Sequence, residues 1–195
     1  MAMKSIDEGR LNADLPYRFE YLTDFMGFTA EDAGLIQSSA PYIGPLIPQL
    51  VEKTYEKLLS YDATARHFVP RQHGYDGPLP VDVKSLTPSH PQIQFRKEHL
   101  SRYFMQLLGR TCDARLVPYL DMVGKIHTPK AGNAELDIPL VQMNALMGLM
   151  ADIIIDTISQ LQLDGTTLIK TIRAYSKLLW IQNDFITRHY AASSD

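Results

Sequence analysis

The sequence predicts an all-α fold built as one domain. Apolar residues recur every three or four positions along most of the 195 residues, which is the spacing of amphipathic helices. Prolines, glycines and polar residues separate these segments, and neither the alternation typical of strands nor an internal repeat occurs. The length suits a single domain with a substantial core. We therefore expect an N-terminal tail over residues 1–16 and one domain over residues 17–195.

The N-terminal part of the domain is expected to begin with two short helices. Residues 17–26 form an aromatic-rich segment of helical spacing. Thr29 can cap a second helix that runs to about residue 38, and Asp32 takes the place of the Glu or Gln in a capping box. Because an aspartate is shorter than the usual residue, this match to the motif is partial.

Prolines then lead into an amphipathic helix over residues 46–60. Its apolar face holds Ile47, Val51, Tyr55, Leu58 and Leu59, whereas charged residues occupy the other face. Residues 62–69 add a turn or two. The segment 70–91 follows with five prolines and two glycines, which predicts a long loop of the kind that is often functional or mobile. We expect His67, at the edge of this loop, to be solvated.

The C-terminal half is expected to contain four helices. Residues 92–108 bury Ile93, Leu100, Phe104 and Leu107, and residues 113–127 form a helix that ends in His127. The mostly apolar run 139–161 is expected to be a central buried helix, and the last helix covers about 167–190. Because a short turn joins these last two helices, they should pack antiparallel.

The composition excludes several classes of protein. A net charge of −3 offers no basis for binding nucleic acid. The single cysteine, Cys112, rules out an internal disulfide and a metal centre built from cysteines. The N-terminus lacks the apolar core of a signal peptide, and the apolar run 145–155 is too short to span a bilayer. We expect a cytoplasmic protein without nucleic-acid or membrane partners.

His127 is the first candidate functional residue. It closes an apolar helical stripe of Leu116, Leu120 and Val123, and a loop follows it. A helix-end histidine that caps carbonyls is the more common structural role. The alternative is a neutral imidazole that binds a haem iron beside the long apolar helix, with its second nitrogen donating to a backbone carbonyl.

Tyr55, Arg96 and Lys97 are further candidates. The Tyr55 hydroxyl points into the core, where it needs a partner, either a backbone carbonyl or a ligand on the far side of the iron. Arg96 and Lys97 interrupt the buried face between Ile93 and Leu100. Each could extend to the surface or pair with an acidic group of a cofactor, such as a haem propionate.

Three stretches of the chain resemble the protoglobins and the globin domains of globin-coupled sensors, within the globin superfamily. Residues 51–60, followed by Phe68, are similar to the family's B helix with its distal tyrosine. Residues 96–103 resemble its E helix, and residues 119–127 its F helix with the proximal histidine. The order and spacing hold over roughly residues 17–190. The resemblance implies a globin-like fold of about eight helices with an extra N-terminal helix.

The resemblance also implies roles for individual residues. His127 would bind the iron of haem b, and Tyr55 would face the distal ligand. The remaining cofactor-binding residues would be Phe68, Arg96, Leu100, Met147 and Leu149. Family members bind oxygen, carbon monoxide or nitric oxide, and a homodimer through the last two long helices is implied as well.

The chain departs from the family pattern at several positions. Thr128 stands where a second histidine often follows the proximal one, Thr54 replaces a common tryptophan, and Leu100 replaces a common phenylalanine. A haem-free globin-fold module that acts through dimer contacts or an apolar ligand is therefore a competing hypothesis. Haem-based redox turnover would need an electron-donor partner. We expect a gas-binding protein and assign no enzymatic activity.

Overall fold

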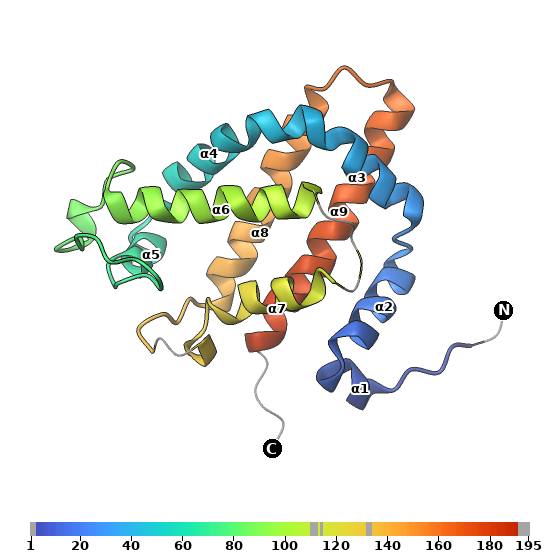
Figure 1. The fold of residues 1–195 in the computed structure, drawn as a ribbon, viewed down its shortest axis with the longest axis horizontal. Coiled ribbons are helices and arrows are strands. Elements are labelled where there is room, and N and C mark those ends of the chain that lie inside the picture. The colour runs from blue at the N-terminus through green and yellow to red at the C-terminus, as the bar shows by residue number, and fades with distance from the viewer. Residues whose placement is uncertain (1–2, 110–112, 114, 132–133, 191–195) are drawn as a thin grey trace.

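The computed structural model describes residues 3–109, 113, 115–131 and 134–190. In this part of the chain the α-helices α1 to α9 are joined by turns and short 3-10 segments, and no β-strand occurs (Figure 1). The all-α prediction is confirmed. Cys112 and the last five residues of the expected domain, 191–195, lie outside the described residues.

The N-terminal helices are α1 (Glu8–Ala13), α2 (Leu15–Met26) and α3 (Ala30–Ile43). Helix α1 lies within the segment expected as a tail. The Thr29 capping box is complete, because the Asp32 carboxylate accepts from the Thr29 N–H at 2.8 Å and the Thr29 hydroxyl accepts from the Asp32 N–H. Helix α3 also continues past the expected end, through Pro41, because Ile36 and Ile43 are both buried in the core.

The middle of the chain holds α4 (Ile47–Leu59), the short α5 (Asp62–Ala65) and α6 (Pro91–Gly109). Helix α4 packs against α6, and α3 packs against α9. The proline-rich segment between α5 and α6 is tied to the domain by two buried glutamines. The Gln92 side chain donates to the Phe68 carbonyl at 2.6 Å and accepts from the Gln72 N–H at 3.3 Å. The segment is therefore anchored at its base.

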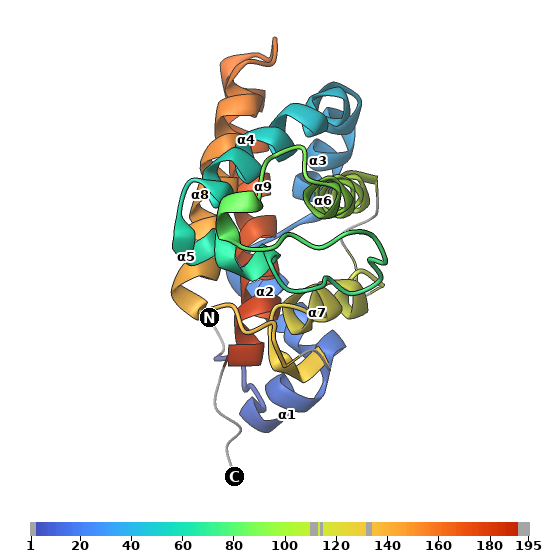
Figure 2. The ribbon, with the colours of Figure 1, turned by 90° about the vertical axis from the view of Figure 1, so that its left-hand side faces the viewer.

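The last helices are α7 (Val117–Lys125), α8 (Leu140–Ser159) and α9 (Gly165–Thr187). Helices α8 and α9 lie side by side and run antiparallel, as predicted (Figures 1 and 2). By length and composition α8 could also cross a membrane, but its inward side packs on α9 and α4. Helix α7 is shorter than expected and ends before His127, because the chain turns at Ile126 into a 3-10 segment at Pro129–Ala131.

The buried side chains form two apolar clusters. The larger one is built by α3, α4, α6, α8 and α9, and the smaller one joins α2, α6, α7 and α9. Leu100 of α6 packs against both clusters. Helix α6 therefore lies at the boundary between the two clusters.

Candidate functional site

The local structure around His127 sets the orientation of its ring. His127 lies two residues beyond the end of α7, and its Nδ1 is 2.7 Å from the Val123 carbonyl oxygen in the preceding turn. The His127 carbonyl accepts from the Ile138 N–H at 3.1 Å, which holds the start of α8 next to the end of α7. The His127 side chain is thus fixed to α7, and its backbone is fixed to the segment that leads into α8.

The His127 imidazole is neutral at physiological pH. Burial and, to a smaller extent, the positive charge of Arg96 lower its pKa to about 4, although the bond to Val123 opposes both effects. Because the Val123 carbonyl can only accept, Nδ1 carries the proton of the neutral ring. The lone pair therefore resides on Nε2, which is the form of histidine that binds a metal.

Helix α7 is held against the C-terminal part of α9. A Cβ atom at Gly124 would lie 2.6 Å from the Phe185 carbonyl oxygen and 2.7 Å from the Ile186 Cα, so only glycine permits this approach. The Asp121 carboxylate accepts from the side chains of Arg188 and His189, the latter at 2.9 Å. These contacts position the end of α7, and with it His127, relative to the core.

Tyr55 lies on the buried face of α4, as predicted, with only 3% of its surface exposed. Its ring contacts Phe68 at a centroid distance of 5.6 Å. Burial raises the pKa of the Tyr55 hydroxyl, while the neighbouring Arg96 guanidinium opposes this shift by its charge and by hydrogen bonding. The hydroxyl is therefore protonated at neutral pH and can donate a hydrogen bond.

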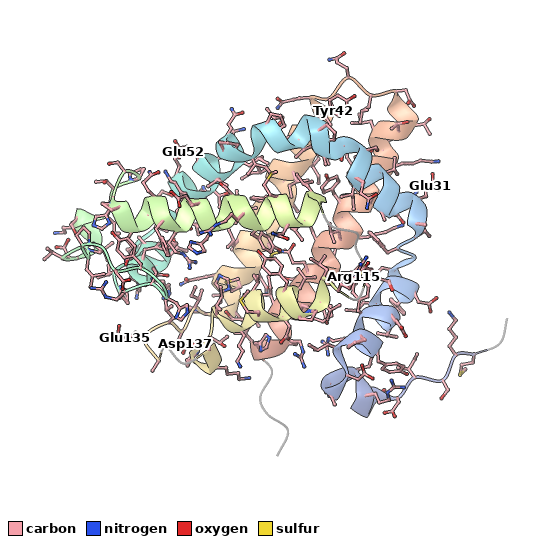
Figure 3. The ribbon with its side chains drawn as sticks, viewed as in Figure 1. Glu31, Tyr42, Glu52, Arg115, Glu135 and Asp137 are labelled. Atoms are coloured by element: carbon pink, nitrogen blue, oxygen red, sulfur yellow. The ribbon has the colours of Figure 1, made fainter. Side chains whose placement is uncertain are left out.

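The two adjacent basic residues of α6 have different environments. Lys97 is buried and pairs with Glu52 of α4 (Figure 3), with Nζ 2.6 Å from a carboxylate oxygen, and it also donates to the Pro88 carbonyl. Arg96 acts electrostatically on both Tyr55 and His127, and its Nε is buried without a hydrogen-bond partner. The Arg96 side chain is thus partly buried and close enough to influence both Tyr55 and His127, whereas Lys97 is held by Glu52.

The other predicted site residues occupy different positions. Phe68 is beside Tyr55, and Leu100 lies one turn beyond Arg96 on α6. Met147 lies on the inward side of α8, where its sulfur accepts from Gln182 at 3.7 Å. Leu149 is partly buried against the larger cluster. Because it follows Met147 by two positions, its side chain lies on a different side of α8 from that of Met147.

A polar group near Phe68 was not predicted. His67 is partly buried and its Nε2 has no hydrogen-bond partner, so the expectation that it is solvated is wrong. Burial and then the Arg66 charge lower the His67 pKa, while Asp137 and Gln142 oppose them. Asp137 lies in the connection from α7 to α8 (Figure 3). His67 sits in a 3-10 turn, where no apolar periodicity marks the inward side.

Helices α6 and α7 meet at one end of the site. The rings of Tyr103 on α6 and Tyr119 on α7 stack with centroids 5.9 Å apart. The chain runs in opposite directions along α6 and α7 (Figure 1). The N-terminal part of α6, which holds Arg96, and the C-terminal end of α7, which leads to His127, therefore lie on the same side of the tyrosine pair.

These residues fit a haem. A neutral imidazole presents Nε2, apolar side chains come from α6 and α8, and two buried nitrogens, Arg96 Nε and His67 Nε2, lack partners. Within the described ranges no group of three or more His, Cys, Asp or Glu side chains could hold a metal ion. A single histidine ligand suits an iron whose remaining equatorial ligands come from a porphyrin.

Comparison with known proteins gives one family assignment. The model of the family described as Protoglobin matches residues 15–195 of the chain. No curated protein matches the chain. The family match confirms the resemblance inferred from the sequence, and with it the globin-like all-α fold class.

Proposed function

Because the chain belongs to the protoglobin family, we propose that it is a haem-binding globin that reversibly binds a diatomic gas, either oxygen, carbon monoxide or nitric oxide. The observation that carries this proposal is the neutral His127 ring, held by Val123 with its Nε2 lone pair available for a metal. Binding, sensing and scavenging of the gas are all compatible with this site. The protein would act in the cytoplasm, without nucleic-acid or membrane partners.

Each site residue has a defined role in this proposal. Haem b would supply the iron that binds the gas. His127 would hold the iron through Nε2, and the hydrogen bond from Nδ1 to Val123 fixes the ring orientation. Tyr55 offers its hydroxyl proton on the ligand side, and Arg96 offers a positive charge there. Phe68, Leu100 and Met147 are assigned to the apolar lining that excludes water, whereas Leu149 lies on a different side of α8 from Met147.

An absorption spectrum of the haem-reconstituted protein tests the proposal. We expect a Soret band that saturates at one haem per chain, shifts on reduction with dithionite and shifts again with carbon monoxide. The second shift would show that a gas reaches the iron. A protein that gives no saturable Soret band would instead support the haem-free regulatory module.

We also propose that the protein forms a homodimer through α8 and α9. The outward sides of these helices carry large exposed apolar residues, with Val141 and Ile155 on α8 and Ile169 and Trp180 on α9. Exposed apolar patches of this kind mark association surfaces. Light scattering should give a dimer mass for the native chain and a monomer mass for Trp180→Glu. A native monomer at micromolar concentration would contradict the proposal.

A further inference from the structure

The proline-rich segment between α5 and α6 lies at the end of the candidate site opposite the tyrosine pair. Helix α6 passes in front of α8, and the stacked rings of Tyr103 and Tyr119 join α6 to α7 at one end (Figure 1). Residues 70–90, which we call the strap, lie at the other end, at the level between α6 and α7, in both views (Figures 1 and 2). The strap is therefore placed as a cover over the end of the site where α6 begins and α7 leads to His127.

Buried side chains fix both roots of the strap. At its start, Gln92 of α6 donates to the Phe68 carbonyl and accepts from the Gln72 N–H, and both glutamines are buried. At its end, the buried Lys97 of α6 donates to the Pro88 carbonyl at 3.1 Å. Breaking these bonds would leave buried polar groups without partners. Any opening of the strap is therefore confined to the part between the two roots.

The tip of the strap folds onto itself and is joined to α6 by an aromatic contact. Arg71 donates to the Tyr75 carbonyl at 2.8 Å, and the Tyr75 hydroxyl donates to the Pro78 carbonyl at 3.2 Å. A Cβ atom at Gly77 would lie 2.3 Å from the Tyr75 hydroxyl oxygen, so the chain wraps closely around this ring. The buried Tyr75 ring contacts Phe95 of α6 with centroids 5.2 Å apart. Neither ring belongs to the two apolar clusters of the core.

We propose that the strap is a gate that retains haem, with the contact of Tyr75 on Phe95 as its latch. This inference rests on the proposed haem function. In the closed state the strap covers the end of the site next to His127. In the open state the latch is broken and the tip moves away from α6, while the roots at Gln72 and Pro88 stay in place. Because the latch lies outside the apolar clusters, opening leaves the core packed. Tyr75 and Phe95 are positioning residues that act through the strap.

Transfer of haem to an acceptor tests the proposal. The haem-loaded ferric chain is mixed with an excess of an apoglobin that binds haem tightly, and the Soret band follows the transfer. We expect Tyr75→Ala and Phe95→Ala each to speed haem loss by about threefold to tenfold, the range for one aromatic contact. The double variant should be no faster than the faster single one, because both substitutions break the same contact. The control Val81→Ala shortens an exposed apolar side chain of the strap and should lose haem at the native rate.

Gly77→Ala is a second variant that keeps both rings. The added methyl group forces the Tyr75 ring to shift, so this variant should also speed haem loss. Denaturant unfolding of the haem-free proteins accompanies the transfer measurements. Since the latch lies outside the apolar clusters, Gly77→Ala should unfold at the native midpoint.

Hydrogen exchange of the haem-loaded chain measures the opening itself. In the tip, the Tyr75 N–H donates to the Gln72 carbonyl at 3.1 Å, whereas at the root the Gln72 N–H donates to the Gln92 side chain. In Phe95→Ala we expect the Tyr75 amide to exchange faster and the Gln72 amide to exchange at the native rate. Val81→Ala should leave both rates native.

The outcomes separate the gate from the haem function. Tip amides that exchange faster while haem loss keeps its native rate would overturn the gate and leave the haem function intact. Root amides that exchange faster together with the tip would also overturn it, because the whole segment would then unfold. A native chain that takes up no haem would overturn the haem function and the gate together.

Discussion

The α9 side and the α4–α6 side of the molecule differ in how their buried charges are partnered. On α9, Asp184 pairs with Arg18 and Lys177 pairs with Asp32, and in the 3-10 segment that follows it Arg188 and His189 bind Asp121. Around the site, Arg96 and His67 each bury a nitrogen that has no partner. The ion pairs of α9 thus form a framework that holds α2, α3 and α7, although the side-chain amide oxygens of Gln182 and Asn183 on α9 are also buried without partners. The α4–α6 side differs because nitrogens of a basic and an imidazole side chain are unpartnered there.

The largest expected effect comes from the residue that the α9 framework positions for the iron. His127→Ala should lose haem or hold it weakly, because it removes the protein's bond to the metal. His99→Ala is the matched control, since His99 makes the same type of bond to a carbonyl four residues earlier, at 2.8 Å, but is exposed. Haem content after gel filtration measures the difference. Full retention with an unchanged spectrum would reject His127 as the ligand.

A substitution at Gly124 should weaken the framework itself. In Gly124→Ala the new methyl group would clash with the backbone of Phe185 and Ile186, so we expect a loss of about 1–3 kcal/mol in the free energy of unfolding. Gly34→Ala is the control, because a methyl group there meets no atom within 4 Å. It should be neutral or stabilising by up to about 1 kcal/mol. Urea unfolding distinguishes the two, and equal stabilities would show that α7 can move away from α9.

Removing the Tyr55 hydroxyl tests the role of the α4–α6 side in holding the bound gas. Tyr55→Phe should speed oxygen release by about tenfold, because it removes a donor to the bound gas. Tyr42→Phe removes a hydroxyl from an exposed ring on α3 (Figure 3) and should leave the rate unchanged. Stopped-flow measurement of oxygen release compares them. If both variants release oxygen at the native rate, Tyr55 serves only core packing.

The smallest effect concerns the pH dependence of the α9 framework. Burial favours a raised pKa for Asp32, but hydrogen bonds from Lys177 and Thr29 outweigh it and lower the pKa below 3.8. The stabilisation is therefore present above about pH 4 and is lost as the pH falls through the lowered value. Asp32→Asn should be less stable at pH 7 and lose less stability on acidification.

The control for this prediction is Glu31→Gln, which breaks an exposed pair with Lys170. It should leave the pH dependence native, since exposed ion pairs contribute little. Denaturant midpoints measured between pH 3 and pH 7 provide the comparison. Parallel curves for the native chain and Asp32→Asn would show that this buried pair contributes nothing to acid stability.

Local patterns in the sequence were sufficient to predict most of the helices and the burial of Tyr55. Helical spacing placed Tyr55 on a buried face, and the apolar stripe before His127 marked the end of α7, although that helix is shorter than expected. The Thr29 cap and the antiparallel pair α8 and α9 also followed from the residues alone. These features depend on residues a few positions apart, which is why the sequence reveals them.

The sequence by itself thus determined the fold class and the family. Only the tertiary structure decided that Lys97 pairs with Glu52 while its neighbour Arg96 turns toward Tyr55 and His127. It also decided that His67 is partly buried. The physical reason is that the burial and pairing of a polar side chain depend on groups far away in the chain, which only helix packing brings together.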